Sequence, residues 1–518
     1  MGKILEIKID NFSKEMTDSV RNENHNGFAF AYNFDIPEPS RLVARRSFTA
    51  ITASNEQIYR FLYTKFKSGA TVVYRLYGMG KSVSTADPIL YQRELTAAGW
   101  TAVTGGEFAT GDIEPRVFFY YKNYVYLFQA VNGTTSAVLS RFGDLTGTPS
   151  KTEDAVVTDF SGSDIGVVTN VAQPVHHPAD DIAYFFMDNK VHKLNNTAWT
   201  ANALTLPDNL KIVGAAPYGD FLAILCSPIE SGTTESFLYL WDRDSSLTTI
   251  SAKINLGVGD AYHIGSDDNG VFIAMIRKSI ADLGEYNTKL VIKYYRGFLI
   301  EKEFSSASAA GYFKDILLNG ASANQYLNSI MVGSGFYFPA TLSTSKDSVK
   351  YDVIFKAKMV NGEVILSANT NYPSIAAGQS LNGIFELTGY FFVSYGSTPL
   401  TAYNAISSVF SSAAMESMIY SVGDPSNKKD LIGVTVFTEP LIAGASYTLK
   451  YRKNAETSWT TIFTESTDDS VSHSSVNIES TGAILGQFKQ IQFRVESEGG
   501  ANITGFSFKV DILSTKPY

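Results

Sequence analysis

The chain has 518 residues and carries 42 Lys and Arg residues against 51 Asp and Glu residues, for a formal net charge of −9. This acidic balance argues against specific nucleic-acid binding, because phosphate contacts need clustered basic side chains. The two basic clusters, residues 41–46 and the pair Lys428 and Lys429, are interrupted or short. The single cysteine, Cys226, excludes disulfide scaffolds and multi-cysteine zinc sites.

No apolar run approaches the roughly 20 residues that span a bilayer. The first residues alternate charged and apolar types and lack the apolar segment of a signal peptide. The hydrophobic fraction of 44% is enough to bury large cores. We therefore expect a folded, soluble protein that is made in a cytoplasm and has no membrane span.

The chain reads as strand almost throughout. Val, Ile, Thr, Tyr and Phe alternate with polar residues in short segments that break at Gly, Asn and Asp. In chain order, hairpin turns are predicted at residues 68–69, 122–123, 188–189, 218–220, 267–270 and 361–362. Two comparable turns, at 218–220 and 267–270, lie about 49 residues apart. Such a period, with four short strands per repeat, is typical of propeller blades.

These patterns predict an all-β fold whose body, residues 46–404, is β-propeller-like with about six to seven blades. Each blade is a four-stranded sheet that buries its faces against its neighbours, and ring closure leaves only short edges. Residues 1–45 are predicted to form either an N-terminal arm that pairs with another subunit or a closing strand that completes a later blade.

Residues 405–518 are predicted to form an antiparallel β-sandwich of jelly-roll or immunoglobulin-like type, because their candidate strands begin at even intervals. The candidate strands are residues 431–437, 446–452, 459–463, 475–478, 490–496 and 505–512. The Ser- and Ala-rich residues 405–421 are interpreted as a linker or as the first strand of this sandwich, with a short helix as the alternative.

Both ends of the chain carry phrases that resemble a family of tailed-phage virion proteins. At the start these are Ile7-Lys-Ile-Asp-Asn-Phe-Ser, Asn26-Gly-Phe-Ala-Phe-Ala-Tyr-Asn-Phe-Asp-Ile-Pro and Arg41-Leu-Val-Ala-Arg-Arg-Ser. Near the end it is Phe488-Lys-Gln-Ile-Gln-Phe-Arg-Val-Glu-Ser-Glu-Gly-Gly-Ala-Asn-Ile-Thr-Gly-Phe-Ser-Phe. Members of this family continue as a propeller-like body and end in a sandwich. The resemblance implies a tail or head-to-tail component with a role in assembly or attachment, and it transfers no catalytic residue.

One His and carboxylate cluster stands out, His176-His177-Pro178-Ala179-Asp180-Asp181. A metal site would need both imidazoles to converge, whereas adjacent residues of a strand point to opposite faces. We therefore interpret the cluster as a loop that enters the next strand. Residues 242–244 and 267–270 could each begin a calcium loop, but neither has the full ligand ladder, and Asp and Asn also stabilise turns.

Two aromatic strips, residues 118–121 and 390–392, could stack on sugars, but alternating strand residues of this kind more often fill a core. Glycoside hydrolysis needs two acids across a cleft, and among 51 acids the spacing in sequence identifies no such pair. The motifs of serine hydrolases, zinc proteases and P-loop proteins are not present. We predict no catalytic, cofactor-binding or metal-binding residues.

The function predicted from these observations is that of a non-enzymatic virion structural protein of a tailed bacteriophage. It would be a tail or head-to-tail adaptor or nozzle component, located in the virion, that acts in particle assembly and in forming the DNA channel. Its expected partners are other virion structural proteins and further copies of itself in a ring, with no cofactor. The alternatives are a carbohydrate-binding protein that attaches to a host-surface glycan and, less favoured, a propeller glycosidase.

Overall fold

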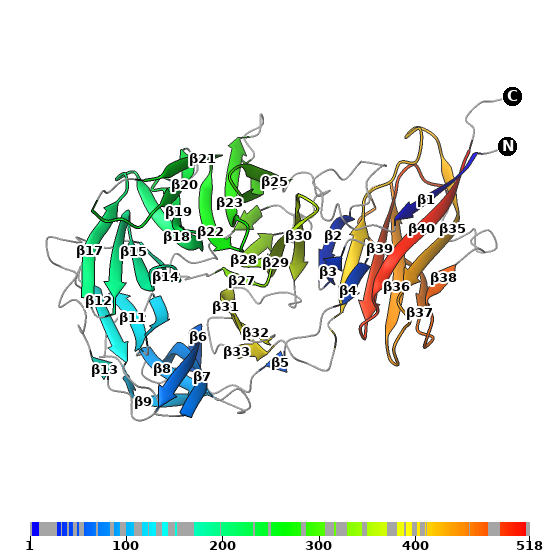
Figure 1. Cartoon of the computed structure of the whole chain (residues 1–518). Helices are drawn as coiled ribbons and strands as arrows, with labels where there is room; N and C mark the ends of the chain where they lie inside the picture. The colour runs from blue at the N-terminus through cyan, green and yellow to red at the C-terminus, as the bar shows by residue number, and fades with distance from the viewer. Residues whose placement is uncertain are drawn as a thin grey trace.

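The computed structural model contains β-strands and no helix in the part of the chain that it describes (Figure 1). The described residues are 3–9, 28–32, 34–38, 41–44, 49–50, 56–68, 71–82, 88–93, 100–107, 117–122, 124–130, 137–142, 151–152, 170–196, 198–230, 234–246, 250–280, 286–305, 315–317, 329–343, 350–369, 381–387, 390–395, 401–404, 410, 412–454, 456–474 and 487–513. Over these ranges, no helix is long and apolar enough to cross a membrane.

Seven sheets of the described chain follow one another around a ring, and we call them blades 1 to 7 (Figure 1). Blade 1 is β6 (Glu56–Ser68), β7 (Thr71–Ser82), β8 (Pro88–Arg93) and β9 (Thr101–Glu107). Blade 2 is β10 (Val117–Tyr121), β11 (Tyr124–Ala130), β12 (Ala137–Phe142) and β13 (Lys151–Thr152). Blade 3 is β14 (Val171–His177), β15 (Ile182–Met187), β16 (Lys190–Asn195) and β17 (Ala198–Thr205). Blade 4 is β18 (Leu210–Tyr218), β19 (Phe221–Pro228), β20 (Glu235–Trp241) and β21 (Ala252–Val258). Blade 5 is β22 (Asp260–Ser266), β23 (Val271–Ile280), β24 (Tyr286–Tyr295) and β25 (Leu299–Ser305).

Blade 6 has an inner edge made of two short strands, and blade 7 takes its last strand from the start of the chain. Blade 6 is β26 (Asp315–Leu317) and β27 (Ile330–Val332), which both pair with β28 (Gly335–Ser343), followed by β29 (Lys350–Val360) and β30 (Glu363–Asn369). Blade 7 is β31 (Leu381–Leu387), β32 (Tyr390–Tyr395), β33 (Thr401–Asn404) and β5 (Thr49–Ala50).

The ring closes between its first and last blades. The strand β5 pairs with β33, placing Ala50 opposite Tyr403, so that an early segment completes a blade built from late sequence. The strand β31 of blade 7 also contacts β6 of blade 1. These observations confirm the predicted all-β, propeller-like body of about six to seven blades.

Local sequence explains the hairpins of the ring. Lys122, Asp188 and Asn361 have φ values of 45°, 51° and 52° in the turns that follow β10, β15 and β29. The turn after β18 uses Gly219, with a φ of 56°. Gly and Asn tolerate this left-handed region best, which is why these residues mark turns in the sequence. The turns at 218–220 and 267–270 occupy equivalent places in blades 4 and 5, as their 49-residue spacing predicted.

The remaining strands lie beside the ring in two sheet layers, which we call the two-sheet unit (Figure 1). The first layer is a sheet of its own, and the second continues the sheet of blade 6. One sheet contains β3 (Phe34–Glu38), β4 (Arg41–Ala44), β40 (Ile503–Ile512), β35 (Lys429–Thr438), β38 (Ser472–Ser474) and β1 (Lys3–Ile9). The other contains β2 (Phe28–Tyr32), β34 (Ala413–Ser417), β39 (Ile491–Glu498), β36 (Ser446–Lys453) and β37 (Thr460–Glu465). The candidate strand at 475–478 lies outside the described residues, and residues 413–417 of the Ser- and Ala-rich stretch form β34.

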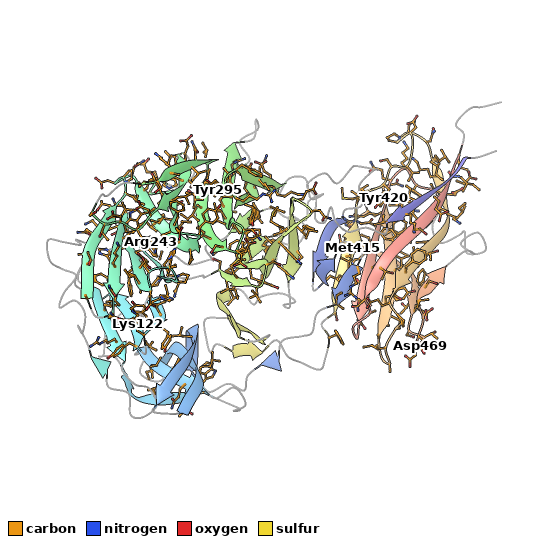
Figure 2. The ribbon with its side chains drawn as sticks, in the orientation of Figure 1. Lys122, Arg243, Tyr295, Met415, Tyr420 and Asp469 are labelled. Carbon is orange, nitrogen blue, oxygen red and sulfur yellow. The ribbon has the colours of Figure 1, made fainter. Side chains whose placement is uncertain are left out.

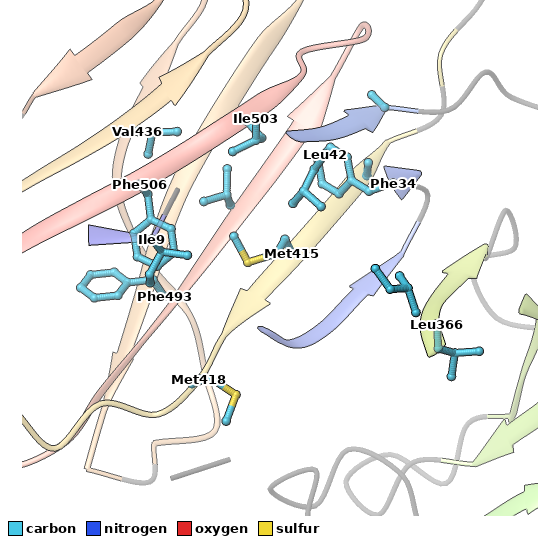
Figure 3. Packing of buried hydrophobic residues seen from close by; sticks show 14 of the residues in the cluster. Ile9, Phe34, Leu42, Leu366, Met415, Met418, Val436, Phe493, Ile503 and Phe506 are labelled. Carbon is cyan, nitrogen blue, oxygen red and sulfur yellow. The ribbon is translucent and has the colours of Figure 1, made fainter. Parts of the chain in front are cut away.

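Aromatic rings hold the two sheets face to face. The ring centroids of Phe493 on β39 and Phe508 on β40 are 4.8 Å apart, and Tyr420 lies 4.9 Å from Phe508. Val436 and Ile503 are fully buried in the same core (Figure 3). The contact between the sheets is therefore a packed apolar layer.

The two ends of the chain meet in this unit. Residues 3–9 pair along their whole length with β40, and β4 pairs with β40 at Leu42 and Ile503. Residues 1–45 were expected as an intersubunit arm or a closing strand. Of their described strands, β1 and β4 pair with β40, β3 pairs with β4, and β2 pairs with β30 and β34, all within the same chain. The strand β5, which closes the ring, follows them. The chain starts in the two-sheet unit, completes the ring and returns.

One sheet runs without a break from blade 6 into the two-sheet unit. The strand β2 pairs with β30 in parallel at Tyr32 and Ala368, and its other edge pairs antiparallel with β34. A single apolar cluster accompanies this sheet and contains Phe355 and Leu366 of blade 6 together with Met415 and Phe34 (Figure 3). A shared sheet and a shared core join the ring and the unit.

Candidate functional site

The His and carboxylate cluster of the sequence lies in the turn between β14 and β15 of blade 3. One side of this turn reaches blade 4. Asp180 Oδ2 accepts a hydrogen bond of 2.5 Å from the Tyr184 hydroxyl and forms an ion pair of 2.7 Å with Arg243 Nη1. Arg243 follows β20 in blade 4, and its Nε and Nη2 groups donate to the carbonyl oxygen of Asp220 at 3.1 and 3.0 Å.

The other side of the same turn reaches blade 2. Lys122 Nζ lies 2.9 Å from Asp181 Oδ2, and the Tyr121 hydroxyl donates to the Asp181 carbonyl oxygen at 2.6 Å. His176 Nε2 lies 2.8 Å from Asp181 Oδ1. The bonds from Lys122 and then His176 lower the pKa of the Asp181 carboxyl, and the same carboxylate raises the pKa of Lys122.

The two adjacent histidines point to different blades, as expected for neighbours on a strand. His176 packs its ring against Tyr121 of blade 2, with centroids 5.6 Å apart. His177 is buried, and its Nε2 lies 3.0 Å from the carbonyl oxygen of Phe221 in blade 4. Burial lowers the pKa of His177. Among the residues that the structure describes, no three His, Cys, Asp or Glu side chains converge on a metal position.

A lysine closes the blade 4 side of this cluster. Lys193 Nζ donates to the carbonyl oxygen of Arg243 and lies 5.0 Å from the ring centroid of Trp241. Burial lowers the pKa of Lys193. The sequence did not reveal the cations that contact this turn, because only the fold brings them together. Lys122 lies in blade 2, Arg243 in blade 4, and Lys193 on another strand of blade 3.

This cluster, which we call the blade clasp, joins three consecutive blades through residues 176–181, Lys122 and Arg243 (Figure 2). Its carboxylates, cations and tyrosine hydroxyl already bind one another. A group that acts as a nucleophile or base must be able to reach a substrate atom. The chemistry that this arrangement supports is therefore mechanical: it fixes the angle between neighbouring blades.

The other acidic turns bond within their own loops. Asp267 Oδ1 accepts the N–H groups of Asn269 and Gly270 at 2.9 and 2.8 Å and the hydroxyl of Tyr294 at 2.9 Å. Asp244 Oδ1 accepts the N–H and hydroxyl of Ser246 at 2.8 and 2.7 Å. These are the self-bonded turns that Asp and Asn commonly make, so both segments are explained without an ion.

The aromatic strip at 118–121 contributes to packing between blades. Tyr121 is buried, and Phe119 meets Phe185 of blade 3 edge to face, with centroids 6.0 Å apart. The side chains of the strip at 390–392 lie outside the described residues. Cys226 is fully buried in β19, and burial raises the pKa of its thiol.

The N-terminal basic cluster serves the two-sheet unit. Arg41 Nη1 lies 2.5 Å from Glu439 Oε1, and Asn502 Nδ2 donates to Glu439 Oε2 at 2.6 Å. Asn502 Oδ1 in turn accepts the N–H of Ala44 at 2.9 Å. These bonds lower the pKa of Glu439 and tie the β3–β4 hairpin to the C-terminal strands. The basic cluster therefore contributes to a structural contact.

Comparisons with known proteins add likenesses of fold. No protein-family model matches the chain, and no curated protein matches it in sequence. Among solved structures, Sqt1 from Chaetomium thermophilum is 9% identical over 70% of this chain and 99% of its own, with a TM-score of 0.39. The β-propeller domain of the Trilobed protease from Pyrococcus furiosus is 8% identical over 67% and 97%, with a TM-score of 0.32. A protein described as a glycoside hydrolase is 10% identical over 89% and 99%, with a TM-score of 0.28.

Proposed function

We propose that this chain is a non-enzymatic structural protein of a tailed-phage particle and acts as a tail or head-to-tail component. The observation that supports the proposal most is the meeting of the two chain ends. The segments that resemble phage virion proteins, within residues 7–47 and 488–508, contribute neighbouring strands to the two-sheet unit through the pairing of β1 and β4 with β40. A resemblance split between the two ends of the sequence thus belongs to one folded unit.

The mechanism that we propose is architectural. The ring presents the turns of seven blades on its faces, and the continuous sheet through β2 sets the direction in which the two-sheet unit projects. A subunit in a particle needs such fixed geometry, because symmetric assembly multiplies weak contacts only when each copy presents them alike. Other virion proteins, and further copies of this chain in a ring, are the partners under this proposal.

The experiment is quantitative mass spectrometry of gradient-purified, nuclease-resistant particles from a culture that produces this protein. We expect the chain to co-sediment with the particles in several copies per capsid. As a matched control, the same culture is fractionated after the particles are disrupted, and the chain then leaves the particle band. Free protein with none in intact particles would overturn the proposal and favour glycan binding or hydrolysis.

A further inference from the structure

An open pocket with a volume of about 380 Å³ lies at one end of the two-sheet unit. Both chain termini lie at this end of the unit (Figure 1). Lys3 pairs there with Ile512, and the carbonyl oxygen of Lys428, a lining residue, accepts a hydrogen bond from the N–H of Leu513. Pockets of this size suit small ligands or single units of a polymer. The lining residues used below are Lys428, Asn454, Gln487, Phe488, Lys489 and Gln490.

The frame of the pocket is fixed by a buried cation. Lys429 is fully buried, and its Nζ donates to the carbonyl oxygens of Asp424, Asn427 and Lys489 at 3.0, 2.9 and 3.1 Å. These three bonds hold the loop before β35 against the segment that enters β39. A buried ammonium group needs such partners, so the loop cannot leave without a large cost.

Asn454 fixes another part of the pocket wall through hydrogen bonds of its side chain. Asn454 has a φ of 49°, and its Oδ1 accepts the N–H groups of Lys489 and Gln490 at 2.8 and 3.2 Å. Asn454 itself is one of the lining residues of the pocket. The walls are therefore preorganised, which lowers the entropy lost when a ligand binds.

The pocket is positively charged in an otherwise acidic chain. Lys428 and Lys489 are exposed, and neither forms an ion pair with a residue that the structure describes. None of the described lining residues has a carboxylate. The carboxylate of Asp424, on the same loop, accepts the N–H and hydroxyl of Ser426 at 2.8 and 2.7 Å. The two free ammonium groups therefore favour an anionic ligand.

The amide side chains indicate which kind of anion fits. Gln487 and Gln490 offer amide donors and acceptors, which match hydroxyl groups, since a hydroxyl also donates and accepts. Asn454 adds only amide donors, because its Oδ1 already accepts two N–H groups. Phe488 is also among the lining residues, but its side chain is buried in the core and offers a ligand little apolar surface. A ligand with hydroxyl groups and a carboxylate satisfies the amide and ammonium groups of the pocket.

We propose that this pocket binds a carboxylate-bearing sugar residue of an acidic glycan. Lys428 and Lys489 bind the carboxylate, and the amide side chains bind the hydroxyls. The site stands independently of whether the chain is a virion component. The outward face of the β39 sheet is a weaker alternative, because Arg494 already pairs with Glu416 at 2.9 Å and with Glu496 at 2.8 Å.

The test is binding of the full-length protein to a panel of uronic-acid and sialic-acid oligosaccharides, each paired with its neutral methyl ester. We expect at least one acidic member to bind and its ester to bind at least tenfold more weakly. The double variant Lys428→Gln, Lys489→Gln should lose at least tenfold in affinity with an unchanged melting temperature. The control is Lys509→Gln, which removes one positive charge from an exposed residue of β40 and should bind like the wild type.

Four results would overturn the proposal. Equal binding of acids and esters would show that charge does not select the ligand. Inorganic phosphate that competes at similar concentrations and with the same dependence on Lys428 and Lys489 would show a general anion site. An acidic panel without any member that binds, or binding that the double variant retains, would show that the pocket is not a saccharide site.

Discussion

Ile9, in the first strand of the chain, lies opposite Phe506, in the last one, and both are buried in the same core. Pairing residues so far apart in sequence closes a very long loop, which contains the whole ring. Contacts of this kind form late, because the entropy of loop closure is lost before they contribute stability. The two-sheet unit therefore depends on both ends of the chain at once.

Truncating Leu42 should weaken the two-sheet unit selectively. Leu42 is fully buried opposite Ile503, so Leu42→Ala should lower the free energy of unfolding of this unit by about 2–5 kcal/mol. Hydrogen exchange followed by mass spectrometry should show lost protection in β35 and β40, with β19 of blade 4 unchanged. The control Leu222→Ala, at an equally buried position of β19, should give the reverse pattern. Uniform loss of protection in both variants would contradict a local role of Leu42 in the two-sheet unit.

Local sequence was enough to predict the hairpins, because each turn and its two strands lie within about 20 residues and obey short-range rules. The spacing of about 49 residues between two of these turns was enough to predict that the hairpins form the blades of a ring. The role of β2 could not be predicted in the same way. Its segment Phe28–Tyr32 reads as an ordinary strand, and only tertiary structure places it between β30 and β34.

The same limit applies to the sites. The turn at residues 176–181 was visible as a cluster, but its cations Lys122 and Arg243 come from neighbouring blades, and no local pattern links them. Lys428 and Lys429 looked like a short basic pair. The fold gives them different roles, since Lys429 is buried among carbonyl groups while Lys428 lines the pocket.

Removing the charge of Asp180 should loosen blade 3 from blade 4. The variant Asp180→Asn keeps the shape of the side chain but leaves Arg243, whose side chain is 12% exposed, without its anion. We expect the free energy of unfolding to fall by about 1–3 kcal/mol. The matched control is Asp181→Asn, because the Asp181 side chain is 62% exposed and water can replace its bonds. Urea titrations of both variants measure the two free energies of unfolding, and equal effects would contradict the larger contribution of the half-buried Asp180–Arg243 pair to the clasp.

Acid should destabilise the ring through His192. This residue is fully buried, and burial lowers the pKa of its imidazole from 6.5 to about 3. Between these values the unfolded chain binds a proton and the native chain does not, so the free energy of unfolding falls as the pH decreases. In His192→Gln, the difference in this free energy between pH 7 and pH 5 should shrink by about 2 kcal/mol.

The measurement is urea unfolding at both pH values, followed by the fluorescence of Trp199, whose indole stacks on His192 with centroids 5.3 Å apart. The control is Val191→Ala, which removes buried volume from the same strand without removing a titratable group. It should lower stability equally at both pH values. A pH dependence in His192→Gln that equals that of the wild type would assign the effect to other residues.

We expect the Cys226 thiol to be unreactive in the native protein and to react only when blade 4 unfolds. Its side chain is fully buried in β19, and burial raises the pKa of the thiol, so reactive thiolate is neither exposed nor populated in the native state. At pH 8, iodoacetamide should add nothing to the native protein and one equivalent to the protein in urea, as read by intact mass. The control Ser245→Cys places a thiol in the exposed turn after β20 and should add one equivalent under native conditions. Rapid labelling of native Cys226 would mean that blade 4 opens far more often than its packed core implies.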